Sequence, residues 1–254
     1  MVTRALFRAI PDSFTRAISR ETPTEPIDVA KARAQHAAYR AAFGDARQVL
    51  VDADEACPDC VFVEDTAVVV GTKALITRPG APSRQREPSA VAAALAPYLD
   101  LVTMEPPATL DGGDVMFAND RCYVGKSTRT NEAGIEMLGR LVGRERLVVV
   151  DLPPSVLHLK CVVSPLEGDQ LALADESLSP DVFPGFEIVR IPVAETYAAN
   201  IVALGGRLIV AEGYPRTLEA LDRAGYDGGD LCEVPVSEVQ KADGSLTCQS
   251  IRWS

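Results

Sequence analysis

Residues 60–80, CVFVEDTAVVVGTKALITRPG, contain two short runs of Val, Ile and Leu on either side of Gly71. Branched aliphatic residues favour strands, and Gly favours tight turns. The stretch therefore predicts two strands around a turn at Gly71. Residues 87–100, EPSAVAAALAPYLD, follow with Ala, Val and Leu at helical spacing. They predict a helix, so the local order is strand, turn, strand, helix.

The same order recurs along the chain. Residues 111–127, DGGDVMFANDRCYVGKS, repeat the two-strand pattern, and residues 130–143, TNEAGIEMLGRLVG, predict the helix after it. A third copy starts at 157–175, LHLKCVVSPLEGDQLALAD. A fourth starts at 200–214, NIVALGGRLIVAEGY, with a helix at 215–226, PRTLEALDRAGY. The unit is strand, turn, strand, helix, strand.

A polar residue stands at the head of each unit: Glu64, Asp111, His158, Asn200 and Cys248. Successive differences are 47, 47, 42 and 48 residues, and a period of this size indicates a repeat architecture. We therefore predict an α/β fold, a five-bladed propeller forming a single domain over 1–254. The fifth unit needs both chain ends, so a strand in 246–253, LTCQSIRW, should pair with one in 3–10, TRALFRAI.

Composition restricts the class of protein. The chain has 254 residues, 47% of them hydrophobic, and a formal charge of −11, which suits a globular core and disfavours nucleic-acid or anionic-membrane partners. It lacks an uninterrupted apolar segment at its start and any apolar run of membrane-spanning length. We expect a cytoplasmic protein with a small cationic partner, as a monomer or a homodimer.

Residues 11–28 interrupt the repeat. This segment carries Pro11, Pro23 and Pro26 among Ser, Thr and Arg, which is loop composition, whereas 29–43 has a strongly helical pattern. A long polar loop in a compact domain is usually functional. We expect a lid here.

Six cysteines without a secretion signal indicate free thiols. Cys57 and Cys60 form CPDC, but no second such pair completes a set of four metal ligands. We therefore expect neither a metal nor another cofactor.

Strand starts in such a ring meet near its axis, so Glu64, Asp111, His158 and Cys248 should share one pocket. A thiolate nucleophile, an imidazole acid/base and an orienting carboxylate are the ingredients of nucleophilic catalysis. His158 lies in an apolar sequence that predicts a strand, where its ring needs a partner, and Asp111 is the expected one. His36 lies in an Ala-rich helical run and favours a packing role.

Six ordered segments resemble the dimethylarginine dimethylaminohydrolase family of guanidine-modifying enzymes. They are DCVFVEDTAVV (59–69), LITRPGAPSR (75–84), TLDGGDVMF (109–117), KSTRTNEAG (126–134), LHLKCVVSPL (157–166) and DGSLTC (243–248). This resemblance implies a five-bladed α/β-propeller, also called a pentein. It also implies hydrolysis of Nω-methylated arginines to citrulline and methylamine or dimethylamine, through a covalent thiouronium on the cysteine.

The resemblance implies a role for each matching residue. Cys248 would be the nucleophile, His158 the acid/base and Asp111 its orienting carboxylate. The implied substrate contacts are Asp59, Glu64, Asp65, Arg84, Arg129, Ile10 and the main chain of Ala242. Acidic residues suit the cationic guanidinium, and arginines suit the carboxylate at the other end of an amino-acid substrate.

Two alternatives remain open. An arginine deiminase would act on unmethylated arginine, but that family commonly carries a second Asp two residues after its His, where this chain has Lys160. A non-enzymatic propeller of similar fold would lack the Cys, His and carboxylate set. Hydrolysis of methylated arginine is the reading that the residues favour.

Overall fold

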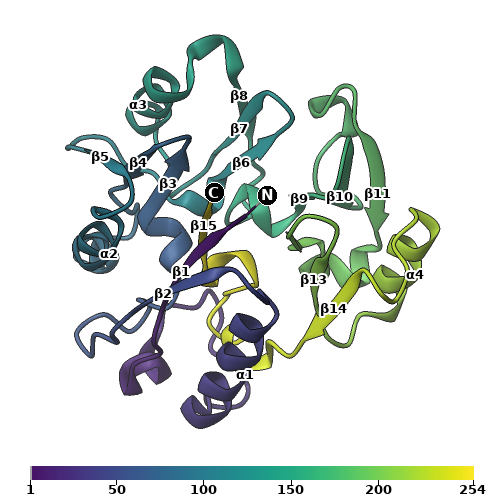
Figure 1. Ribbon diagram of the computed structural model, residues 1–254, viewed down its shortest axis with the longest axis horizontal. Coiled ribbons are helices and arrows are strands. Elements are labelled where there is room, and N and C mark those ends of the chain that lie inside the picture. Colours follow the sequence, from purple (N-terminus) through teal and green to yellow (C-terminus); the bar gives the residue numbers. More distant parts are fainter. Residues whose placement is uncertain (1) are drawn as a thin grey trace.

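The computed structural model describes residues 2–254, which form five three-stranded sheets arranged around a central axis (Figure 1). The strands are β1 (Arg4–Arg8), β2 (Arg47–Val51), β3 (Ala67–Val70), β4 (Lys73–Ile76), β5 (Asp100–Thr103), β6 (Val115–Ala118), β7 (Arg121–Lys126), β8 (Leu147–Asp151), β9 (Val163–Pro165), β10 (Gln170–Ala174), β11 (Glu187–Ile191), β12 (Val202–Ala203), β13 (Leu208–Ala211), β14 (Leu231–Val234) and β15 (Ile251–Trp253). The helices are α1 (Val29–Ala41), α2 (Pro88–Leu95), α3 (Glu132–Val142), α4 (Pro215–Arg223) and α5 (Ser237–Gln240). The five-bladed α/β-propeller is confirmed.

Every blade has the same topology. In the blade of residues 60–103, β3 pairs antiparallel with β4, and β4 pairs parallel with β5. Gly71 makes the turn between β3 and β4 with φ of +59°, a conformation that Gly adopts at little cost. A parallel pair needs a long crossover, which α2 supplies between β4 and β5. The predicted order of strand, turn, strand, helix and strand is therefore confirmed for this blade.

One predicted helix is absent. Between β10 and β11 the helical structure described in residues 2–254 is a single 3-10 turn, η7 (Pro180–Val182). Pro180, Pro184 and Gly185 lie in this connection, and Gly185 has φ of +87°. Proline removes a backbone donor and glycine favours turns, so this blade crosses over without an α-helix.

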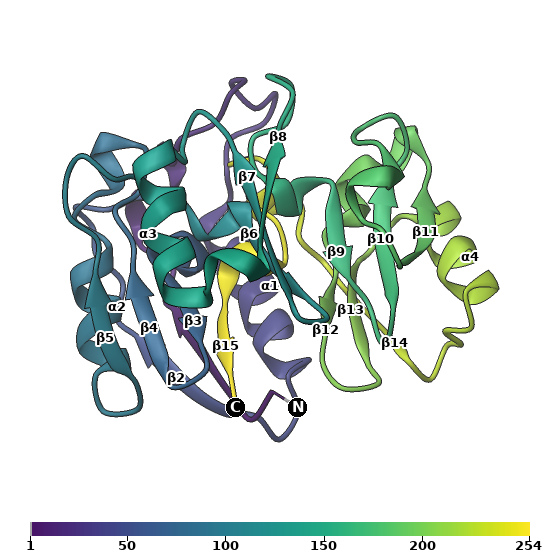
Figure 2. The ribbon, with the colours of Figure 1, turned by 90° about the horizontal axis from the view of Figure 1, so that it is seen from above.

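The two chain ends close the ring. β15 pairs antiparallel with β1, with Arg4 opposite Trp253 and Leu6 opposite Ile251, and β1 pairs parallel with β2. Both ends of the chain lie side by side in Figures 1 and 2. The predicted pairing of terminal strands is confirmed, and this blade alone is built from both ends.

The hydrophobic core is divided among the junctions between neighbouring blades. Met116 and Tyr123 of one blade pack with Leu171 and Leu173 of the next, and the other four junctions hold similar clusters. Strands alternate their side chains between two faces, so each sheet contributes to two clusters. Apolar burial between blades thus holds the polar strand heads around the axis.

His36 lies on α1 inside one of these clusters and sets an acid sensitivity. It is 4% exposed, packs edge-on against Phe7 at 6.1 Å between ring centroids, and its Nε2 has no partner among residues 2–254. Burial lowers its pKa from 6.5 to about 4, and nearby Arg40 lowers it further. The folded chain therefore binds fewer protons here than the unfolded chain, and stability falls as the pH drops below about 6.5.

We predict that His36→Leu will remove part of this pH dependence. Between pH 7 and pH 5 the His36 contribution to the free energy of unfolding should fall by about 2 kcal/mol. Urea unfolding of both proteins at the two pH values measures this difference. Equal losses of stability in wild type and variant would contradict the prediction.

Candidate active site

Short 3-10 turns carry the polar heads of the blades at one end of the axis. They include η2 (Val63–Thr66), η4 (Gly112–Asp114), η6 (Leu159–Cys161) and η9 (Thr247–Gln249). His158 was predicted in a strand, but it immediately precedes η6 with φ of −138° and ψ of 156°. The turns place side chains from separate blades close to one another, which a strand running away from the axis would not do.

A pocket of about 100 Å³ lies over these turns. Its lining residues are Ile18, Ser19, Arg20, Asp59, Phe62, Asp65, Arg84, Arg129, Leu157, His158, Ala242, Asp243, Gly244 and Cys248. It thus gathers most of the residues predicted for the site, from six separate parts of the chain.

Asp111 and His158 form a buried pair at the edge of this pocket. Asp111 Oδ2 lies 3.0 Å from His158 Nε2, and Asp111 Oδ1 accepts the N–H of Gly80 at 2.8 Å. Asp111 is fully buried. A Cβ on Gly113 would lie 2.8 Å from the His158 ring, so only glycine leaves room for the imidazole there. The expected partnership of His158 and Asp111 is present.

Asp114, which we did not predict, supports the same pair from behind. Its carboxylate accepts hydrogen bonds from the hydroxyls of Ser127 and Thr130, both at 2.6 Å, and from the N–H of Leu159 at 3.1 Å. Thr130 Oγ1 in turn accepts the N–H of Asp111. Asp114 therefore ties the residue after His158 to the segment that holds Asp111.

The electrostatics favour an imidazolium beside a neutral thiol. Burial lowers the pKa of His158, but the charge of Asp65 and the hydrogen bond to Asp111 outweigh it, and the pKa lies well above its ordinary value. Burial raises the pKa of Cys248 well above its ordinary value, and the carboxylates of Glu64 and Asp65 raise it further. The favoured protonation states are thus a charged His158 and an uncharged Cys248.

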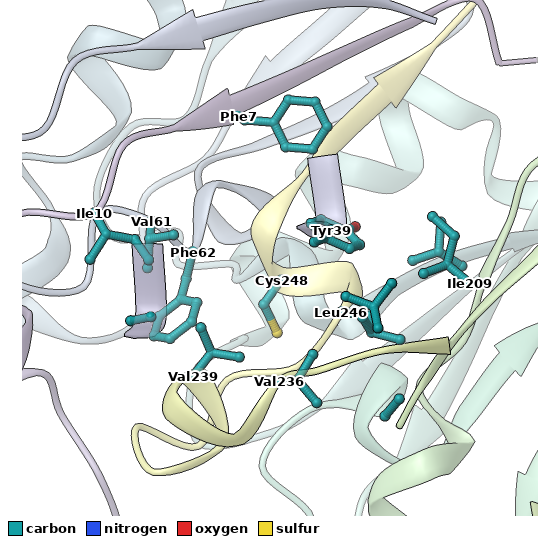
Figure 3. Close-up of a cluster of buried hydrophobic side chains, with 14 of the residues drawn as sticks. Phe7, Ile10, Tyr39, Val61, Phe62, Ile209, Val236, Val239, Leu246 and Cys248 are labelled. Atoms are coloured by element: carbon teal, nitrogen blue, oxygen red, sulfur yellow. The ribbon is translucent and has the colours of Figure 1, made fainter. Parts of the chain in front are cut away.

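Cys248 lies at the boundary between the pocket and a hydrophobic cluster. It is 9% exposed and packs with Phe62, Val239 and Leu246 (Figure 3). An apolar wall excludes water from the adjoining part of the pocket, and charges in that part interact more strongly because little water screens them. The position suits a nucleophile for a charged substrate.

Asp65 and Arg84 form the most strongly paired part of the pocket wall. Arg84 Nη1 donates to Asp65 Oδ2 at 2.6 Å, and its other nitrogens donate to Glu87 and to the carbonyl of Phe62. Asp65 also accepts the N–H of Gly113. Burial raises the pKa of Asp65, but His158 and Arg84 outweigh it and hold that pKa below its ordinary value. Arg84 was predicted to bind a substrate carboxylate, yet its donors largely serve Asp65 and Glu87.

The guanidinium of Arg129 has fewer protein partners than that of Arg84. Its Nη1 lies 3.9 Å from Asp111 Oδ2, and about a fifth of its side chain is exposed. Asp59, also predicted for the site, accepts the N–H of Ile18 at 2.9 Å. Arg129 and Asp59 thus place opposite charges on the pocket lining.

Residues 18–20, in the segment after η1 (Asp12–Arg16), line the pocket, whereas Ile10, which the resemblance implied as a substrate contact, lies elsewhere. Ile10 is 2% exposed and packs in the core with Val61 and Phe62 (Figure 3), outside the pocket lining. Ile18 lines the pocket instead. A loop has no periodicity by which the inward residue could be found.

Arg20 fastens this covering segment. Its N–H donates to Asp243 Oδ2 at 2.6 Å, and its Nη1 donates to the carbonyl of Ser155 at 2.6 Å. Asp243 has φ of +54°, an uncommon conformation for a residue with a side chain. It follows Ala242, which lines the pocket. Neither Arg20 nor Asp243 was predicted.

Glu64 was predicted to contact the substrate, but its side chain is directed elsewhere. It pairs with Lys160, accepts the hydroxyl of Thr247 at 2.8 Å and lies 3.6 Å from Arg252 Nη2. It does not line the pocket that contains Cys248. The side chains of adjacent residues on a tight turn point in different directions. The Asp65 side chain therefore lines the pocket of Cys248, and the Glu64 side chain points toward the axis of the propeller.

Three possible metal ligands meet in the pocket. An oxygen of Asp65, an oxygen of Asp111 and a ring nitrogen of His158 lie within 4.8 Å of one another. Each carboxylate already accepts hydrogen bonds from protein groups, Asp65 from Arg84 and Gly113, and Asp111 from Gly80. Cys57 and Cys60 are buried free thiols, and the Cys60 N–H donates to the Cys57 carbonyl.

No helix within residues 2–254 combines the length and the apolar character needed to cross a membrane.

Comparisons with known proteins agree with this geometry. The sequence model of the arginine deiminase family matches residues 30–189. An N(G),N(G)-dimethylarginine dimethylaminohydrolase of Pseudomonas aeruginosa is 39% identical over 89% of this chain and 90% of its own length. An enzyme of the same name from Streptomyces coelicolor is 38% identical over 98% of this chain and 96% of its own length.

Solved structures give the same result. A cysteine-to-serine mutant of the Pseudomonas aeruginosa enzyme, complexed with citrulline, has a TM-score of 0.93, 36% identity and full coverage of both chains. The N-terminal domain of ArgZ, a cyanobacterial arginine dihydrolase, has a TM-score of 0.87 at 18% identity and covers 99% of this chain and 97% of that one. At 18% identity, the similarity to ArgZ supports the fold alone.

Proposed function

This chain belongs to the dimethylarginine dimethylaminohydrolase family, and from that membership we propose that it hydrolyses Nω-methylated arginines to citrulline and methylamine or dimethylamine. The observation that carries the proposal is the pocket that joins Cys248 to His158 and its partner Asp111. A similar enzyme was solved with citrulline bound. The partner is thus a small amino acid.

The charges of the pocket support one orientation of the substrate. Asp65 and Asp59 would face the cationic guanidinium, and Arg129 would face the carboxylate at the other end. Arg84 would act mainly by fixing Asp65. The main chain of Ala242 and the side chain of Ile18 would complete the walls, and residues 11–28 would serve as a lid.

The reaction begins when Cys248 gives its proton to solvent as the cationic substrate binds. In the free enzyme its pKa is raised by burial and by the carboxylates of Glu64 and Asp65. A bound guanidinium cation offsets those negative charges and favours the thiolate. The sulfur then attacks the guanidinium carbon, so ionisation of the nucleophile depends on the substrate.

His158 would supply and recover one proton. It donates that proton to the methylated nitrogen, the C–N bond breaks, and the amine leaves a thiouronium on Cys248. Neutral His158 next removes a proton from water, and the hydroxide adds to the same carbon. The C–S bond then breaks as the hydroxyl proton of this adduct passes to the sulfur, which releases citrulline and the free Cys248 thiol. Asp111 holds the imidazole in place for both transfers.

Citrulline release from asymmetric dimethylarginine, monomethylarginine and arginine tests the proposal. We expect turnover of a methylated substrate with kcat/KM at least about tenfold above that for arginine. Lys160 stands where arginine deiminases commonly have a second carboxylate, and its ammonium pairs with Glu64. A preference for arginine would instead assign the chain to deiminase chemistry.

A further inference from the structure

Four buried residues lie behind the nucleophile, and each comes from a different blade. They are Glu64, Lys160, Asn200 and Thr247, with exposed fractions of 4%, 9%, 2% and 2%. We call them the axial cluster. A second hollow of about 100 Å³, lined by Glu64, Lys160 and Arg252 among others, shares no lining residue with the pocket of Cys248. The axial cluster is therefore not part of the substrate pocket.

Thr247 is the centre of this cluster and immediately precedes Cys248. Thr247 Oγ1 donates its proton to Glu64 Oε2 at 2.8 Å. Thr247 Oγ1 also accepts a hydrogen bond from Asn200 Nδ2 at 2.9 Å. Its N–H donates to Asn200 Oδ1 at 2.9 Å. The hydroxyl and the N–H of Thr247 are thus both hydrogen-bonded to residues of other blades, and these bonds fix the position of the start of η9.

Asn200 and Lys160 extend the same network to the acid/base. Asn200 Nδ2 also donates to the carbonyl of Lys160 at 2.7 Å, and the Lys160 ammonium pairs with Glu64. Lys160 lies two residues after His158 on η6. One set of bonds therefore joins the turn of the nucleophile to the turn of the acid/base.

We propose that the axial cluster positions Cys248 against His158 from behind, and that Glu64 acts in this cluster and does not contact the substrate. Buried hydrogen-bond networks of this kind hold a single geometry because each broken bond leaves an unpaired polar group. A displacement of about 1 Å at a reacting group can lower turnover about 100-fold. This role rests on the proposed hydrolytic function.

Glu64 would have a second effect through its charge. Burial, Glu64 and Asp65 together raise the pKa of Cys248. Because Glu64 lies outside the pocket, a bound substrate cannot pair with it directly. Its charge would keep the thiol protonated until the guanidinium arrives.

The first test compares Thr247→Val with Thr247→Ser. Valine keeps the shape but removes the hydroxyl, so kcat should fall about 10- to 100-fold while KM changes less than about threefold. Serine keeps the hydroxyl and should restore kcat to within about threefold of wild type. The matched control is Thr217→Val, because Thr217, on α4, is equally buried, and its hydroxyl donates to Glu195, away from the pocket. This control should change stability alone.

The second test measures alkylation of Cys248 by iodoacetamide across pH in the substrate-free enzyme. Glu64→Gln should move the midpoint down by about one pH unit, since a charge that disfavours the thiolate is gone, with KM within about threefold of wild type. If Glu64→Gln does not fold, the Thr247 pair decides.

An unchanged kcat in Thr247→Val, or a loss that Thr247→Ser does not restore, would overturn the proposal. So would a Glu64→Gln enzyme whose KM rises more than about tenfold with an unchanged alkylation profile. Absence of turnover in wild type would refute the proposed function instead, and the alkylation profile would still test the axial cluster.

Discussion

Cys248→Ser will lower citrulline release by at least about 1,000-fold, because a serine hydroxyl is a far weaker nucleophile than a thiolate and has no base within its own turn to activate it. The substitution replaces sulfur by oxygen in a residue that is 9% exposed. We therefore expect the free energy of unfolding to change by no more than about 1 kcal/mol. Steady-state assays and urea unfolding on the same preparation measure both quantities.

Cys232→Ser is the matched control for this variant. Cys232 is a partly buried free thiol on β14 and lies outside the pocket. It should retain wild-type kcat. If Cys248→Ser kept more than a tenth of wild-type turnover, another group would have to be the nucleophile.

Removal of residues 248–254 will prevent cooperative folding. The deletion removes β15, and with it the buried side chains of Ile251 and Trp253 and the hydrogen bond of 2.8 Å between Tyr39 and Ser250. A buried large side chain contributes about 3–5 kcal/mol, and the stability of a whole domain is about 5–15 kcal/mol. Near-ultraviolet circular dichroism and urea unfolding should show no native transition.

A single substitution separates packing from the loss of the nucleophile. Trp253→Ala should destabilise the protein by about 3–5 kcal/mol, whereas Val193→Ala, at a residue that is 52% exposed, should change stability by less than about 0.5 kcal/mol. A truncated chain with the wild-type unfolding midpoint would show that the ring does not need its last strand.

The repeat made the ring predictable from sequence. Spacing of the polar heads identified which residues lie at one end of the axis, and the pairing of β1 with β15 followed from the incomplete units at each chain end. The absence of a helix between β10 and β11 could also have been predicted, because Pro180, Pro184 and Gly185 oppose helix formation.

Side-chain direction within a turn was not predictable. Glu64 and Asp65 are neighbours with the same chemistry, and spacing alone cannot tell which one enters the pocket and which one faces the axis. Asp114 was missed because its role is to bond Ser127, Thr130 and the Leu159 N–H, contacts that exist only in the folded chain. Ile10 was carried over from the family resemblance, and the loop around it has no periodicity that would point to Ile18, which lines the pocket.

The pairing of the first strand with the last has a consequence for synthesis of the protein. A ribosome makes β1 before β15, so the edge of β1 that pairs with β15 stays open until β15 emerges. An open strand edge is a site for unwanted pairing with other chains. The nascent chain is thus exposed to aggregation while it still lacks Cys248, and the segment that closes that edge also brings in the proposed nucleophile.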